Sequence, residues 1–108
     1  SATGEEKVCQ AWINFNGEST ISIRDSHNVS SITDNGTGKY LVTFSTAMSN
    51  TNYAPVVSGH DLTDDSGGST KPANRRTALA TTDFGIRSTS NGDTFYDSGY
   101  IFAVVFGA

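Results

Sequence analysis

The sequence has little cysteine, little basic charge and no long apolar run. Cys9 is the only cysteine among 108 residues, so no disulfide can form within the chain. No apolar run approaches the ~20 residues of a membrane-spanning helix, so membrane insertion by a helix is not expected. Seven Lys and Arg against eleven Asp and Glu give a net charge of −4, which disfavours nucleic acid and anionic membranes as main partners.

Small polar residues dominate what is present. Ser, Thr, Asn and Gly number 47, whereas Leu, Ile, Val and Phe number only 22, which is close to the composition of disordered chains. The modest net charge, the 10% of aromatic residues and the grouping of apolar residues between turn signals nevertheless predict a folded chain. The length fits one domain over 1–108, with 1–7 as linker. Because the sequence opens with Ser1 and shows no signal peptide, we expect a mature or excised piece.

The pattern predicts an all-β fold, as a small antiparallel β-sandwich or a barrel-like domain. Val, Ile and Thr total 27 against three Leu, no helical apolar stripe is sustained, and Gly, Asn and Asp clusters recur about every ten residues. The expected strands are 9–15, 19–24, 28–33, 39–45, 53–59, a weak 76–82, 83–89, 93–97 and 100–106.

Local signals assign faces and turns to these strands. Alternation predicts that Ala11, Ile13 and Phe15 share an inward face, as do Tyr40, Val42 and Phe44. Turns are expected at Asn16-Gly17, at 34–38 (Asp-Asn-Gly-Thr-Gly) and at Asn91-Gly92. Pro55 cannot donate to a ladder, which predicts an edge or bulged strand.

The last predicted strand, 100–106 (Tyr-Ile-Phe-Ala-Val-Val-Phe), is apolar on both faces. A half-exposed antiparallel strand alternates, so this pattern indicates that both faces are covered. Either a loop of the same chain or another subunit would provide the outer cover, and we favour a subunit.

The segment 60–74 is expected to be a long exposed loop, and such loops are usually functional or disordered. Its carboxylates and amides can hydrogen-bond sugar hydroxyls, so it is the first candidate for ligand contact. Arg75 and Arg76 could attract an anionic group, such as a phosphate or an acidic sugar, but we favour pairing with the acidic loop. Tyr96, an aromatic residue beside a hairpin tip, is the second candidate for ligand contact. The candidate ligand-binding residues are His60, Asp61, Asp64, Asp65, Arg75, Arg76 and Tyr96.

No catalytic or metal site is predicted. Asp25, Ser26 and His27 have the residue types of a nucleophilic triad, but neighbours on a strand point to opposite faces, and a turn is the expected structure there. The acidic residues of 60–74 do not have the spacing of an EF-hand loop, and we expect no metal and no cofactor. A glycosidase would need paired carboxylates at a defined separation, which makes a carbohydrate-active enzyme the least favoured alternative.

Several segments carry a resemblance to a known module. Residues 9–17 (Cys-Gln-Ala-Trp-Ile-Asn-Phe-Asn-Gly), 21–24 (Ile-Ser-Ile-Arg), 28–38 (Asn-Val-Ser-Ser-Ile-Thr-Asp-Asn-Gly-Thr-Gly) and 39–44 (Lys-Tyr-Leu-Val-Thr-Phe) resemble a module of tail-fibre proteins from tailed bacteriophages, prophages and marine phages. Residues 47–48, 52–54 and 99–107 extend the match, which covers 9–58 and 83–107 and departs at 60–82.

The resemblance implies a distal, C-terminal fibre domain that assembles as a homotrimer and acts without catalysis. Such domains adsorb the virion to a host-cell surface glycan or outer-membrane protein, so the implied location is the tail fibre of the virion, outside the cell after release. No receptor-contact residue is carried over from the module. The alternative is a structural domain that trimerises or caps the fibre and leaves recognition to another part.

Overall fold

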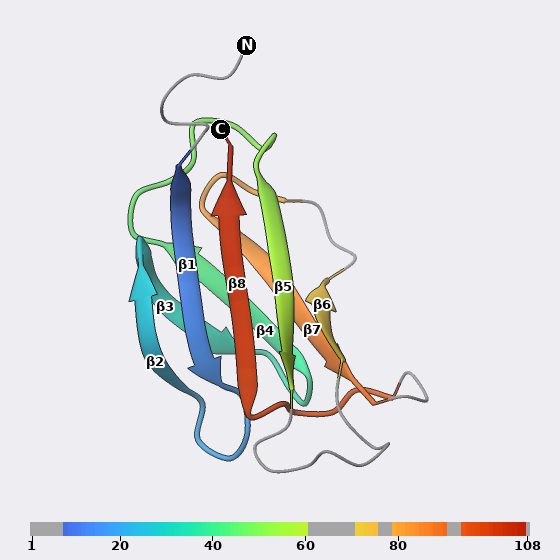
Figure 1. Cartoon of the computed structure of the whole chain (residues 1–108). Coiled ribbons are helices and arrows are strands. Elements are labelled where there is room, and N and C mark those ends of the chain that lie inside the picture. The colour runs from blue at the N-terminus through green and yellow to red at the C-terminus, as the bar shows by residue number, and fades with distance from the viewer. Residues whose placement is uncertain (1–7, 61–70, 76–78, 91–93, 108) are drawn as a thin grey trace.

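The computed structural model describes residues 8–60, 71–75, 79–90 and 94–107, which form two four-stranded antiparallel sheets packed face to face (Figure 1). Sheet A has the order β2-β1-β8-β5, and sheet B has the order β3-β4-β7-β6. The predicted all-β sandwich is therefore confirmed. The strands are β1 (Cys9–Asn16), β2 (Ser22–His27), β3 (Val29–Asp34), β4 (Lys39–Phe44), β5 (Ala54–His60), β6 (Lys71–Asn74), β7 (Asp83–Thr89) and β8 (Tyr100–Phe106).

The core lies between the sheets and follows the period-two alternation of the strands. The inward residues predicted for β1 and β4 are all buried, and the residues between them point away from the core. The rings of Phe15 and Tyr40 meet edge to face at 5.2 Å between centroids, which joins sheet A to sheet B. Phe44, Tyr53 and Phe84 form a second aromatic group at 5.6–6.4 Å.

Asn28 carries the chain from sheet A to sheet B. Its φ of 56° is in the left-handed region, which asparagine tolerates better than most residues. Its side chain donates to Gln10 O and Thr46 O at 3.2 and 3.1 Å and accepts from Thr46 N at 2.7 Å. The turn predicted at Asp25–His27 is therefore wrong, because β2 extends through His27 and the single residue Asn28 makes the corner.

The prediction of 60–74 as one long loop is wrong at both ends. His60 ends β5, and Lys71–Asn74 forms β6, which pairs with β7 at the edge of sheet B. Pro72 hides this strand in the sequence, but an edge position tolerates proline. Residues 61–70 lie outside the described residues.

Two other predicted strands also differ from the structure. Of 76–82, the described residues 79–82 are not a strand, and the carbonyls of Thr81 and Thr82 accept hydrogen bonds from the backbone N–H groups of Met48 and Phe44. Of 93–97, only an isolated bridge between Thr89 and Phe95 is present among the described residues. The turn at 34–38 is confirmed between β3 and β4, with Gly36 and Gly38 at positive φ.

Strand β8 is central in sheet A, where its inner face is buried and its outer face is partly exposed. Ile101, Ala103 and Val105 are buried, whereas Val104 and Phe106 on the outer face are 36% and 41% exposed. No segment among the described residues covers these two side chains. Strand β5, which contains Pro55, is at the edge of sheet A, as expected.

Candidate functional site

The β1–β2, β3–β4 and β7–β8 connections meet at one end of the sandwich, here called the loop end (Figure 1). The Asp97 side chain links two of these connections by hydrogen bonds. Its Oδ1 accepts a hydrogen bond from the backbone N–H of Gly38 at 2.8 Å and another from the Tyr40 hydroxyl at 2.8 Å. The same hydroxyl lies 3.1 Å from Gly17 O. One carboxylate thus fixes a hairpin turn, a core tyrosine and the approach to β8.

Tyr40 acts as a neutral donor in this arrangement. Burial, reinforced by the hydrogen bond to the Asp97 carboxylate, raises the pKa of the Tyr40 phenol well above its usual range. The hydroxyl therefore keeps its proton at physiological pH, so Tyr40 positions Asp97 and does not exchange protons with a ligand.

Close packing at the loop end requires glycine at two positions. A Cβ on Gly17 would overlap the Tyr40 hydroxyl and lie 2.9 Å from Ser98 O, while Gly17 N donates to Ser98 O at 2.9 Å. The sequence suggested a positive φ for Gly17, but the close approach of Tyr40 and Ser98 is the observed constraint. Gly38 has φ +70°, and a Cβ there would overlap Ser88 O.

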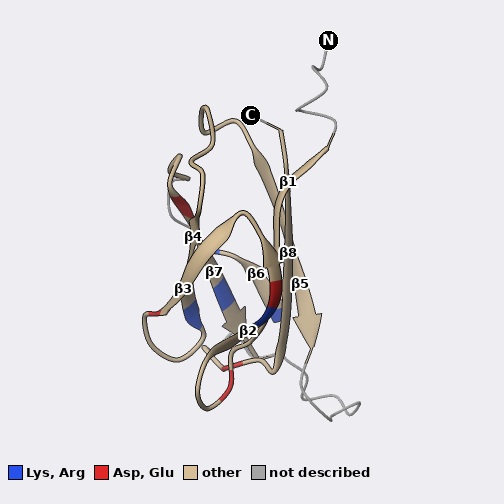
Figure 2. Ribbon diagram, turned by 90° about the vertical axis from the view of Figure 1, so that its left-hand side faces the viewer, with Lys and Arg blue, Asp and Glu red and all other residues tan. Residues whose placement is uncertain are grey.

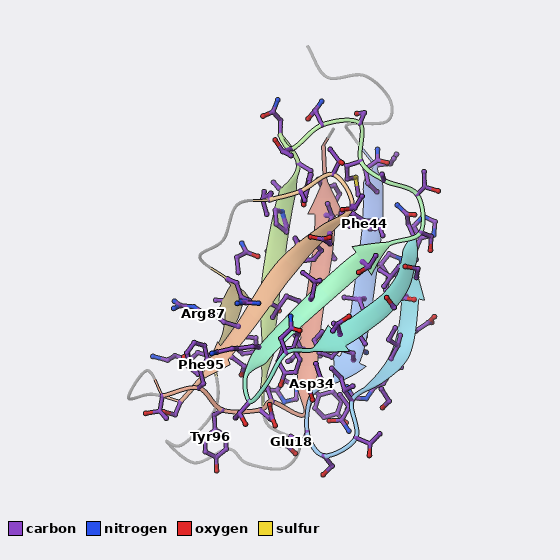
Figure 3. The ribbon with its side chains drawn as sticks, turned by 180° about the vertical axis from the view of Figure 1, so that it is seen from behind. Glu18, Asp34, Phe44, Arg87, Phe95 and Tyr96 are labelled. Atoms are coloured by element: carbon purple, nitrogen blue, oxygen red, sulfur yellow. The ribbon has the colours of Figure 1, made fainter. Side chains whose placement is uncertain are left out.

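An open hollow of about 340 Å³ lies at the loop end. Tyr96, 57% exposed, presents its ring beside it (Figure 3). The rest of the lining is polar and combines carboxylates with hydroxyls. An aromatic face next to such groups suits a ligand with an apolar face and a hydroxylated rim, such as a sugar. The lining residues are Glu18, Ser19, Thr37, Tyr96 and Asp97.

The predicted site residues are only partly brought together. Tyr96 lines the hollow, and His60 ends β5 near it, where the His60 carbonyl accepts from the Ser98 hydroxyl at 2.9 Å. Arg75 lies elsewhere, beside β7, because its backbone N–H donates to Gly85 O. Asp61, Asp64, Asp65 and Arg76 lie outside the described residues.

The His60 ring contributes to a stack on the outer face of sheet A. It lies 4.7 Å from the Tyr100 ring centroid, and Arg24 Cζ lies 4.0 Å from the same centroid. Arg24 also donates to Gly99 O at 2.6 Å and to Asn14 Oδ1 at 3.2 Å. These contacts order the surface next to the loop end.

Sequence reasoning missed Glu18, Thr37, Asp97 and Phe95. Nothing in the sequence around Asp97 indicates a hydrogen bond to Tyr40, which is far away in the chain. Glu18 and Thr37 belong to separate hairpins, and only the packing of the sheets puts them in one hollow.

The described residues contain no group of three or more His, Cys, Asp and Glu side chains arranged to hold a metal ion. Asp25, Ser26 and His27 lie on one strand, where Ser26 pairs with the inward residue Ile13 and His27 with the outward residue Trp12. The three side chains therefore do not share a face. In the part of the chain that is described, no helix has the length and apolar character to cross a membrane.

Comparison with protein-family models, curated proteins and solved structures found no match to this chain.

Proposed function

We propose that this chain is a receptor-binding domain of a phage tail fibre that contacts a host-cell surface glycan or outer-membrane protein and catalyses no reaction. The observation that carries the proposal is the open hollow at the loop end, which is lined by residues with carboxylate and hydroxyl groups and has the exposed ring of Tyr96 beside it. The resemblance of 9–58 and 83–107 to tail-fibre modules supports it.

The mechanism is binding by weak contacts repeated in several copies. The Tyr96 ring offers a flat apolar surface to a sugar ring, and the hydroxyls of Ser19 and Thr37 and the carboxylate of Glu18 offer hydrogen bonds around it. Three copies in one fibre, and several fibres on one particle, multiply the strength of attachment without new contacts. The segment 60–74, which precedes and includes β6, remains a predicted contact.

Competition with intact phage for host cells tests this proposal. The purified domain is expected to reduce adsorption, and Tyr96→Ala is expected to reduce that competition about tenfold because an aromatic contact is lost. Val8→Ala, an exposed apolar residue before β1, serves as the control. A domain that folds but never competes contradicts the proposal.

The second candidate function is structural, namely trimerisation or capping of the fibre. It is favoured by the outer face of sheet A, where Val56 pairs with Val104 and Val104 pairs with Trp12. Val56 is 59% exposed, and exposed apolar patches on a sheet indicate an interface. On this view the face binds sister copies in a homotrimer, and the isolated domain assembles but does not compete for cells.

A further inference from the structure

Four of the seven Lys and Arg of this acidic protein lie in sheet B or next to it in the chain (Figure 2). Lys39 of β4 pairs with Arg87 of β7, and both point outward because the residues next to them in each strand are buried in the core. Arg87 in turn pairs with Ala73 of β6, and Lys71 lies two residues along the same edge strand.

Arg75 joins this group by crossing the outer surface of β7. A Cβ on Gly85 would lie only 2.8 Å from Cδ of Arg75, so the Arg75 stem occupies the space that a side chain at Gly85 would need. Gly85 and Arg87 share a face and are separated by about 7 Å along the strand. The two guanidinium groups are therefore held on one surface, which we call the basic face. It consists of Lys39, Lys71, Arg75 and Arg87, four of the seven Lys and Arg of the chain.

The Arg87 side chain is held against the sheet. Its Nε is buried and has no hydrogen-bond partner among the described residues. A side chain positioned in this way loses less freedom when its outer nitrogens bind an anion. The positive charges of the basic face repel one another when no ligand is bound, and a bound anion relieves that repulsion.

An aromatic ring connects the basic face to the hollow. Lys39 Nζ lies 4.7 Å from the ring centroid of Phe95, which is 43% exposed and precedes Tyr96 in the chain (Figure 3). Thr43, on the same outer face of β4, adds a hydroxyl group. The described acidic residue on this face is Asp83, which pairs with Thr43 at the opposite end of β7 from Arg87.

We propose that the basic face binds an anionic polysaccharide, one that bears carboxylate or sulfate groups. This inference rests on the proposed receptor-binding function and names the chemical class of the receptor. Spaced cations match charged groups along an extended polymer, and the exposed rings of Phe95 and Tyr96 and the hydroxyls suit sugar rings between those groups. The net charge of −4 opposes any polyanion at long range, so binding depends on this local group of cations and is expected to weaken as salt is raised.

Dextran sulfate and dextran provide a matched pair of probes with the same backbone, and polygalacturonate tests carboxylate groups. The chain is expected to bind dextran sulfate or polygalacturonate but not dextran, with affinity falling as salt is raised. The double variant Arg75→Gln, Arg87→Gln keeps most of each aliphatic stem and is expected to bind about tenfold or more weakly. Arg24→Gln removes the same charge from sheet A and is the control, with thermal unfolding measured for each variant.

The outcomes separate this inference from the proposed function. Equal binding to dextran, or unchanged binding by the double variant, overturns the basic face as the site. Tighter binding to single-stranded DNA than to either anionic polysaccharide overturns the glycan in favour of nucleic acid. If the domain competes with phage for host cells but binds neither anionic polysaccharide, the proposal of an anionic receptor is wrong and the proposed receptor-binding function still stands. Binding to them without competition for any host overturns the proposed function alone.

Discussion

Asp97 is the residue on which the loop end depends most directly. Its carboxylate accepts from Gly38 N and from the Tyr40 hydroxyl, and Gly38 and Tyr40 are both buried. A buried donor that loses its acceptor costs more free energy than the hydrogen bond itself contributes. The turn chemistry of a single residue therefore determines the shape of the hollow.

Asp97→Ala is expected to lower the free energy of unfolding by about 1–3 kcal/mol, because it leaves Gly38 N without an acceptor. Asp34→Ala is the matched control, since the Asp34 carboxylate accepts from the exposed Gly36 N at 3.0 Å and its loss is expected to cost about 0.5 kcal/mol or less. Urea unfolding measures both values. An equal decrease of the free energy of unfolding in the two variants contradicts the central role of Asp97.

Stability at alkaline pH is expected to depend on Tyr53. Burial raises the pKa of the Tyr53 phenol to about 12 from its usual 10.0, and its hydroxyl donates to the carbonyls of Ala80 and Asp83. Above pH 10 the Tyr53 phenol loses its proton in the unfolded chain but keeps it in the folded chain. The contribution of Tyr53 to the free energy of unfolding is therefore complete below pH 10 and is lost as the pH rises toward 12. Tyr53→Phe is expected to be less stable at neutral pH and to lose less on going to pH 12, as measured by unfolding at each pH. An identical pH dependence in both proteins contradicts this.

At the scale of elements, glycine allows strands and loops to approach each other. Gly17 brings the β1–β2 connection against Tyr40 and Ser98, whereas Gly85 makes room on β7 for the stem of Arg75. Gly17 lies next to a core ring and a backbone carbonyl, whereas Gly85 lies next to the side chain of Arg75. A methyl group at Gly17 would therefore disturb the surrounding packing more than a methyl group at Gly85.

Gly17→Ala is expected to destabilise the protein by about 1–3 kcal/mol, because the core side chain and the backbone next to it cannot move away freely. Gly85→Ala is expected to cost less, about 1 kcal/mol, because Cδ and Cγ of Arg75 can rotate away and its Cβ, 3.0 Å from the added methyl group, must shift only slightly. Thermal unfolding of the two variants compares them. A larger loss for Gly85→Ala shows that the Arg75 stem is fixed and not flexible.

At the scale of the whole molecule, the two sheets present opposite chemistry to their surroundings. Sheet A exposes Val56, Val104 and Phe106 on its outer face, and sheet B exposes the basic face. An apolar face suits association with copies of the same chain, and a charged face suits a ligand from outside. Assembly and recognition would then occupy separate sides of one small domain.

The wild-type chain is expected to sediment as a trimer at micromolar concentration. The double variant Val56→Thr, Val104→Thr keeps the β-branched shape but makes the face polar, and it is expected to shift toward monomer. Val8→Thr, outside the strands, is the control. A wild-type monomer at all concentrations contradicts the assembly through sheet A.

Much of the fold was predictable because it depends on local patterns. Alternation assigned the inward residues of β1 and β4, turn residues predicted the β3–β4 connection, and Pro55 predicted an edge strand. Strand β6 and the corner at Asn28 were not predicted, since an edge pairing that includes Pro72 and a crossing made by one asparagine leave no periodic signal. Of the candidate site, Tyr96 was predicted, whereas Asp97 and Glu18 were not.

The sequence by itself determined the class of the fold and the two faces of each strand, because a period of two is a property of each segment alone. Only the tertiary structure decided which strands pair, that Lys39 lies beside Arg87, and that Asp97 reaches Tyr40. These contacts join residues far apart in the chain. Their partners are selected by the packing of both sheets around a common core, which no single segment encodes.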